Sequence, residues 1–143
     1  PSPVPPAADL VETVRRLADA GDYAGAETAC REALAIAPED SGLHLLDGLV
    51  LQALGRPAAA EAALKRALYL DRGFVLAHYH LGLLLLERGR AKAAARSLKT
   101  AAQIAGTLPV EMRLAHGAGL AAGQLRKSVR LLLQTLGGGV KTT

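Results

Sequence analysis

Hydrophobic positions in this chain recur in sets that are 34 residues apart. Four such sets run through three copies: Leu17, Leu51 and Leu85; Ala26, Ala60 and Ala94; Ala33, Ala67 and Ala101; and Ile36, Leu70 and Ile104. Glycine keeps the same interval at positions 21, 55 and 89. Leucine and alanine are good helix formers and glycine commonly ends a helix, so the pattern predicts helices that are separated at the glycines.

The interval of 34 residues points to a known repeat. Two antiparallel helices per copy, with small side chains where they cross, are typical of the tetratricopeptide repeat. On these positions the chain resembles such an array, with repeats at residues 7–40, 41–74 and 75–108. The resemblance implies an all-α fold in which three helix hairpins stack into a superhelical array. Pro57 agrees with it, because proline is tolerated in the first turn of a helix.

The region after the third repeat predicts one more helix. From Leu125 to Leu136, leucine and valine follow helical spacing, while arginine and lysine occupy the other face. We expect a capping helix over residues 120–136 that covers the third repeat, after a connecting loop at 109–119. The alternative is that this helix docks into a partner or into a second copy of the chain.

The two ends are predicted to be irregular. Residues 1–6 are rich in proline, which favours a stiff, extended linker and suggests that another domain precedes this one. The glycines at 137–139 should end the last helix, and residues 137–143 should form a flexible tail.

Composition and charge narrow the class of protein. The single cysteine excludes an internal disulfide framework and a thiolate zinc cage, so we expect a cytoplasmic protein. No apolar run approaches the length of a membrane span, and the first residues do not resemble a secretory signal, so we expect no membrane insertion. Residues 1–40 hold eight acids and three bases, whereas 41–143 hold five acids and fourteen bases. Because aromatic residues are not interleaved with the bases, this charge favours steering of a protein partner over nucleic-acid binding.

Few side chains suggest chemistry. Cys30 occupies a position that is leucine in the other two repeats, so it is predicted to be a core residue. His78 and His80 point apart on a helix and cannot easily share a metal ion. Asp47 stands at an inward position where the next repeat has leucine, and we expect His44, three residues earlier, to be its partner. We therefore predict no catalytic residue, metal site or cofactor within this chain.

The expected binding surface is the concave groove of the array. In such arrays the first helix of each repeat lines the groove, and the resemblance assigns to it Val11, Arg15, Leu45, Leu49, Gln52, Leu76, Tyr79, Leu83, Leu86 and Glu87. Most of these side chains are aliphatic, and a contiguous apolar strip rarely faces water without a reason. We expect an amphipathic helix of a protein partner to lie there. The alternative is that the strip is covered within the domain or at a dimer contact.

Two segments resemble a more specific family. Residues 67–82 (ALYLDRGFVLAHYHLG) and 119–126 (GLAAGQLR) are similar to the repeat junction and the closing segment of the C-terminal arrays in CheR-type chemotaxis methyltransferases. The resemblance implies a regulatory domain of an enzyme that uses S-adenosylmethionine to methylate receptor glutamates, with its catalytic residues outside this chain. The partner would be the cytoplasmic domain of a chemoreceptor or the methyltransferase domain itself. The alternatives are a generic scaffold or secretion-type adaptor, and an oligomerisation module.

Overall fold

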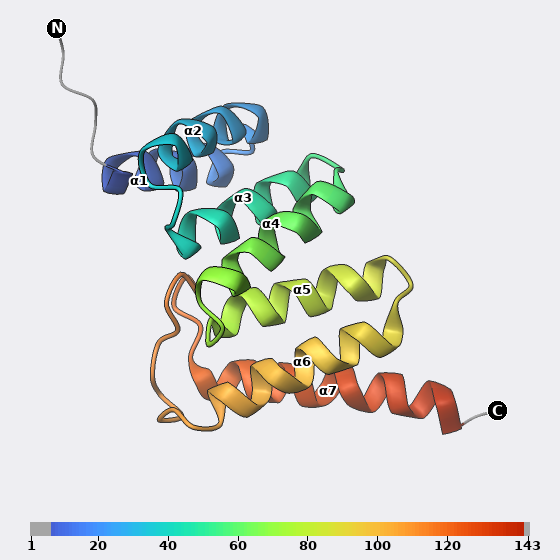
Figure 1. Ribbon diagram of the computed structural model, residues 1–143. Coiled ribbons are helices and arrows are strands. Elements are labelled where there is room, and N and C mark those ends of the chain that lie inside the picture. The colour runs from blue at the N-terminus through green and yellow to red at the C-terminus, as the bar shows by residue number, and fades with distance from the viewer. Residues whose placement is uncertain (1–6, 142–143) are drawn as a thin grey trace, which may run out of the picture. The chain divides into compact units, whose positions relative to one another are not determined.

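Seven α-helices make up the part of the chain that the computed structural model describes, which is residues 7–141, with side chains described for residues 9–137. They are α1 Ala7–Asp19, α2 Tyr23–Ile36, α3 Ser41–Ala53, α4 Pro57–Leu70, α5 Val75–Glu87, α6 Ala91–Ala105 and α7 Ala122–Lys141 (Figure 1). The first six form three hairpins and α7 packs against α6, which confirms the predicted all-α fold. The predicted linker at residues 1–6 and the last two residues lie outside the described part.

The chain divides into two compact units. Helices α1–α4 form the N-terminal unit, which ends at Arg72, and helices α5–α7 form the C-terminal unit, which begins at Gly73. The N-terminal unit therefore contains two hairpins, and the C-terminal unit contains the third hairpin with α7.

Each hairpin turns at a glycine in the left-handed conformation. The φ angles are +82° at Gly21, +75° at Gly55 and +76° at Gly89. In the first turn, the amide of Asp22 donates to the carbonyl of Leu17 at 2.9 Å and closes the end of α1. A residue with a Cβ is strained at such angles, so the interval between these glycines reflects a requirement of the backbone.

The paired helices meet where one side chain is absent. A Cβ on Gly48 of α3 would lie 2.9 Å from Cγ of Leu64 on α4. A Cβ on Gly82 of α5 would lie 2.7 Å from Cγ of Leu98 on α6. Both leucines are fully buried, so each fills the space that its glycine leaves.

The first hairpin makes the same crossing with different side chains. Val14 of α1 and Cys30 of α2 occupy the positions that are glycine and leucine one repeat later. Both are fully buried in one core cluster, which confirms the prediction that Cys30 is a core residue. A medium side chain on each helix thus replaces a glycine opposite a leucine, and cores tolerate such exchanges when total volume is kept.

A largely buried carboxylate joins the two hairpins of the N-terminal unit. The side chain of Glu27 on α2 is 12% exposed and accepts from Arg56 at 2.7 Å. It also pairs with Arg31, one turn further along its own helix. Because Arg56 immediately precedes α4, this ion pair connects α2 to the turn of the second hairpin, beside the packing of α2 on α3.

A folded loop connects α6 to α7 in the C-terminal unit. The amide of Leu114, a buried residue, donates to the carbonyl of Leu120 at 2.9 Å and draws the loop back on itself. The loop also reaches the start of α5, where the ring centroids of Phe74 and His116 are 5.7 Å apart. The connection at 109–119 is therefore a packed element with its own internal contacts.

The last helix differs from its predicted bounds. It packs against α6, with Leu125 and Val129 fully buried. The prediction of a helix over 120–136 is wrong at both ends, because α7 begins at Ala122 and continues to Lys141. The glycines at 137–139 do not end it: each lowers helix propensity by about 1 kcal/mol relative to alanine but still supplies its backbone donor and acceptor.

A methyl group added at the glycine crossing should destabilise the protein. Gly82→Ala places a Cβ 2.7 Å from Leu98 and should lower the free energy of unfolding, by roughly 1–3 kcal/mol, although alanine is the better helix former. Gly137 lies in α7, and a Cβ added there meets no heavy atom within 4 Å. Gly137→Ala should therefore raise the free energy of unfolding by up to about 1 kcal/mol. Urea unfolding followed by circular dichroism measures both, and equal stability of the two variants would show that the crossing does not limit packing.

Candidate functional site

The first helices of the N-terminal unit, α1 and α3, contact each other and carry half of the assigned groove residues. Leu45 is fully buried, so its assignment to an open groove is wrong: it belongs to the core. Val11, Arg15, Leu49 and Gln52 are half-buried. These four side chains, two apolar and two polar, stay partly accessible to a partner.

In the C-terminal unit, α5 carries the other assigned residues. Leu76 is 2% exposed because the loop covers it. A Cβ added at Gly117 of the loop would lie 3.3 Å from Cδ1 of Leu76. The assignment of Leu76 to an open groove is therefore also wrong. The remaining assigned residues are accessible: Tyr79, Leu83 and Leu86 are half-buried and Glu87 is exposed. The first three follow the i, i+4, i+7 spacing that places side chains on one stripe of a helix, and we call them the α5 stripe.

Asp47 on α3 is a carboxylate in a partly buried place. Burial raises the pKa of Asp47 from its ordinary value, and the charge of Glu27 also raises it. The charges of His44 and Arg31 lower the pKa of Asp47 but do not outweigh burial. The expected partner His44 has its Nε2 2.9 Å from the carbonyl oxygen of Pro38, so its ring is held by the preceding turn and influences Asp47 only through its charge.

The other candidate chemical groups are Cys30, which is fully buried, and His80, which is half-buried. Burial, together with the charges of Asp47 and Glu27, raises the pKa of the Cys30 thiol to about 12. A thiol with such a pKa is not a nucleophile at neutral pH. Burial also lowers the pKa of His80, which is therefore neutral at pH 7.

The described residues contain no group of three His, Cys, Asp or Glu side chains that is arranged to hold a metal ion. None of the helices that the structure describes combines the length and the apolar character needed to cross a bilayer.

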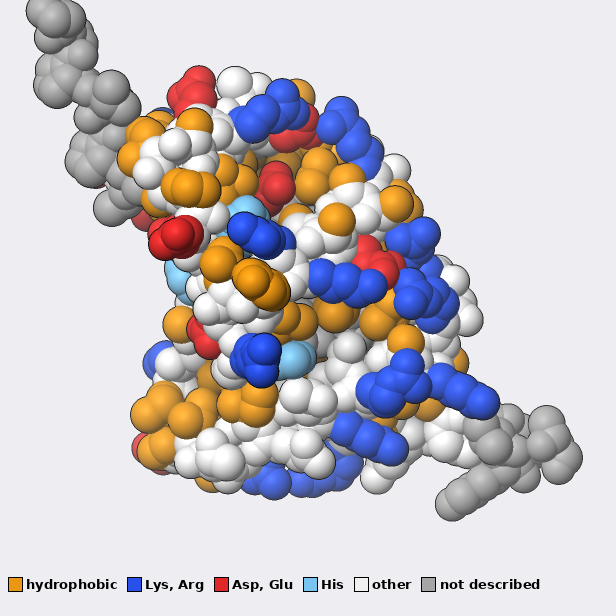
Figure 2. All heavy atoms as spheres, in the orientation of Figure 1, with side chains coloured by type: hydrophobic (Ala, Val, Ile, Leu, Met, Phe, Trp, Pro, Cys, Tyr) orange, Lys and Arg blue, Asp and Glu red, His pale blue; other side chains and the backbone are white. Residues whose placement is uncertain are grey.

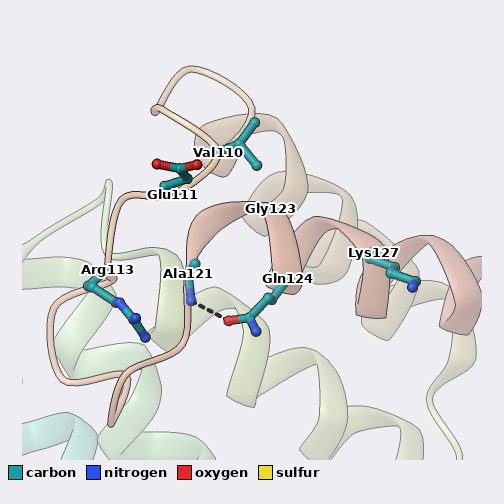
Figure 3. A pocket seen from close by; sticks show the side chains of 7 residues that line it. All are labelled: Val110, Glu111, Arg113, Ala121, Gly123, Gln124 and Lys127. Carbon is teal, nitrogen blue, oxygen red and sulfur yellow. Dashed lines mark hydrogen bonds between the residues drawn. The ribbon is translucent and has the colours of Figure 1, made fainter.

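An open hollow of about 590 Å³ lies where the loop meets α7 in the C-terminal unit (Figure 3). Its lining consists of Val110, Glu111, Arg113, Ala121, Gly123, Gln124 and Lys127. The backbone here is fixed by two bonds: the amide of Ala121 donates to Oε1 of Gln124 at 2.8 Å, and the amide of Gly123 donates to the carbonyl of Val110 at 2.9 Å. These amides at the start of α7 are thus already satisfied within the protein.

The polar side chains of this hollow do not converge on one point. In Figure 3, Arg113 and Lys127 lie on opposite sides of Gln124, and Glu111 lies above on the loop. Arg113 donates to the carbonyl of Gly119, within the same loop. Sequence reasoning missed this hollow because the loop and α7 are brought together only by the fold.

Removing the charge of Asp47 should stabilise the protein at neutral pH. Because folding raises the pKa of this carboxyl, stability is lost as pH rises through the range above its ordinary value. Asp47→Asn should therefore raise the melting temperature at pH 7 by roughly 3 °C, and the difference should vanish below about pH 3, where the carboxyl is neutral in both states. The control is Glu39→Gln, an exposed carboxylate. An unchanged or lower melting temperature for Asp47→Asn at pH 7 would contradict the burial of its charge.

Comparison with known proteins identifies the fold. Residues 17–73 match the family model for the tetratricopeptide repeat. Comparison with curated protein sequences finds no match. The solved structures that are similar include the type III secretion translocator chaperone SycD of Yersinia enterocolitica, with a TM-score of 0.78, 19% identity, and coverage of 90% of this chain and 88% of that chain. SycD in complex with a peptide of the translocator YopD is also similar, with a TM-score of 0.68, 18% identity, and coverage of 86% and 91%.

A further similar structure is the O-GlcNAc transferase of Thermobaculum terrenum, in a mutant form. It has a TM-score of 0.66 and 32% identity over 68% of this chain, and this chain spans only 19% of that enzyme's length. The paired helices, the left-handed glycines at a fixed interval and these matches agree with one another. The chain is therefore an all-α array of stacked helix hairpins, and its residues 17–73 match the family model of the tetratricopeptide repeat.

Proposed function

We propose that this chain is a protein-binding adaptor that holds a segment of a partner protein against the first helices of its repeats. The observation that carries the proposal is the α5 stripe, whose side chains stay partly accessible although α5 has buried residues on its other faces. Apolar surface at helical spacing suits the apolar face of another helix. Leu49 on α3 offers a similar contact in the N-terminal unit.

The similar structures support an adaptor. SycD is a secretion translocator chaperone, and one of its structures holds a peptide of the translocator YopD. SycD is less than 25% identical to the present chain, so the likeness shows a shared fold. That the present chain also binds a segment of a partner protein is part of our proposal. Among the readings of the sequence, the secretion-type adaptor is the one that these similarities favour.

Truncation of the α5 stripe should weaken partner binding. Peptides about 15 residues long, long enough for an amphipathic helix of four turns, are selected from a display library on the full chain. Leu83→Ala should then lower the affinity of the selected peptides about tenfold in fluorescence anisotropy, because an apolar anchor is lost.

The control for this test is Leu131→Ala, which truncates a leucine that is 55% exposed on α7. This variant should bind as the wild type does. Equal affinities for the two variants and the wild type, with both variants folded by circular dichroism, would contradict the stripe as the binding surface.

A finer function is a second candidate: regulation of chemoreceptor methylation, with S-adenosylmethionine bound by a catalytic domain outside this chain. The observation in its favour is that segment 119–126, which resembles the closing segment of those enzymes, contributes three residues to the hollow of Figure 3. The fold itself accounts for other residues of this segment: Gly119 has a φ of +93° and Leu125 is fully buried. The resemblance is therefore weaker support than the similarity of folds.

A methylation assay tests the finer function. The proposed methyltransferase domain and its receptor are assayed with and without the present chain added in excess. A changed rate, or a changed choice of glutamates, would support regulation. Unchanged methylation by a folded chain would leave the general adaptor as the proposal.

A further inference from the structure

Charge is divided unevenly between the two units. Residues 1–72 hold seven Lys or Arg and eleven Asp or Glu, whereas residues 73–143 hold ten Lys or Arg and two Asp or Glu. Helices α6 and α7 contain no acidic residue at all. Their cations therefore have no ion-pair partner on their own helices, in contrast to Glu27 and Arg31 of α2.

The cations of α6 lie on one face. Lys92, Arg96 and Lys99 follow i, i+4, i+7 spacing and are all exposed. On α7, which packs against α6, Arg126 and Arg130 are one turn apart and exposed as well. Figure 2 shows Lys and Arg side chains gathered over this end of the C-terminal unit, with few Asp or Glu among them.

A second hollow, of about 270 Å³, lies between these two helices. Its lining consists of Ala102, Gln103, Arg126, Val129, Arg130 and Leu133. Ala102 and Leu133 are half-buried, so the accessible floor of the hollow is apolar, whereas Val129 is fully buried. The exposed lining residues are polar or basic: Gln103, Arg126 and Arg130. Lys99 lies one helical turn before Gln103 on the same face of α6, which extends the positive rim.

An apolar floor inside a positive rim specifies the chemistry of an occupant. An aliphatic side chain fits the floor, and carboxylates beside it on the same segment reach the guanidinium groups, with which they form strong, often bidentate, hydrogen bonds. Helices α6 and α7 contain no aromatic residue on which bases could stack. Leu125 and Val129 of α7 are buried, so the apolar side of this helix is not available for insertion into a lipid surface.

We propose that the hollow between α6 and α7, with its rim of Lys99, Arg126 and Arg130, docks an acidic segment of the partner protein. The segment places a leucine-like side chain over Ala102 and Leu133, the accessible apolar residues of the lining, and flanks it with Glu or Asp. This inference rests on the proposed adaptor function for its partner, but it concerns a different surface from the α5 stripe. One partner would then be held at two places of the C-terminal unit, by apolar contact on α5 and by charge on α6 and α7.

The test uses a synthetic peptide of repeated Glu-Glu-Leu triplets and a matched peptide of Gln-Gln-Leu triplets, bound to the full chain and measured by fluorescence anisotropy. The Glu peptide should bind at least about tenfold more tightly than the Gln peptide, and its affinity should fall as salt is added. Arg126→Gln combined with Arg130→Gln should weaken the Glu peptide about tenfold. Circular dichroism checks that the variant is folded.

The matched control removes two positive charges from the other hollow. Arg113→Gln combined with Lys127→Gln changes the net charge of the same unit equally, but these residues line the hollow of Figure 3. This variant should retain affinity within about threefold, since only long-range attraction is reduced. An equal loss in both double variants would overturn the proposal, because it would show diffuse attraction without a site.

Other occupants give different results. Tighter binding to phosphatidylserine vesicles or to duplex DNA than to the Glu peptide would overturn the acidic protein segment in favour of those ligands. Light scattering that shows self-association of the wild type, lost in the Arg126→Gln/Arg130→Gln variant, would overturn it in favour of a second copy.

The two proposals fail separately. Leu83→Ala should leave binding of the Glu peptide unchanged. If the Glu peptide still binds and Leu83→Ala affects no selected peptide, the result would support the hollow between α6 and α7 as a binding site and contradict the α5 stripe. If the Glu peptide binds no more tightly than the Gln peptide, while Leu83→Ala weakens the selected peptides, the result would support the α5 stripe and contradict the hollow between α6 and α7.

Discussion

The close contact between the two helices of each hairpin is the constraint on which the remaining structure depends. In the second and third hairpins a buried leucine packs directly against a glycine, so that a Cβ added to the glycine would lie less than 3 Å from the leucine side chain. Protein interiors are packed tightly enough that one added methyl group at such a place is felt. Because Val14 and Cys30 make the equivalent crossing in the first hairpin, the constraint acts on the combined size of two side chains and not on glycine itself.

Packing on one side of each first helix determines what remains accessible on the other. On α5 the residues that face the interior are buried, and the loop before α7 covers Leu76 at the start of the helix. The contact of Phe74 with His116 holds this loop near the start of α5, and residues 74–77 are buried, so the accessible surface of α5 begins at His78. The loop that covers Leu76 also connects α6 to α7, and the two hollows described above are lined by residues of the loop, α6 and α7.

Electrostatics differ between the two units for a physical reason. In the N-terminal unit the carboxylate of Glu27 is largely buried and bound by two arginines, which satisfies its charge inside the protein. Asp47 is only partly compensated, so burial raises its pKa and its charge costs stability at neutral pH. In the C-terminal unit the cations of α6 and α7 are exposed and have no acidic residue on their own helices. Exposed charges contribute little to stability but attract and orient a partner.

The sequence by itself determined the elements that local physics controls. The interval of 34 residues predicted the three hairpins and the helix ends at the glycines, because helix propensity and backbone angles act within a few residues. It did not reveal that Leu45 and Leu76 are buried, that His44 is held by Pro38, or that α7 runs through three glycines. Burial, hydrogen-bond partners and hollows depend on which residues from distant parts of the chain come together. Only the tertiary structure decided these, because contacts across elements have no signature in the spacing of residues along one helix.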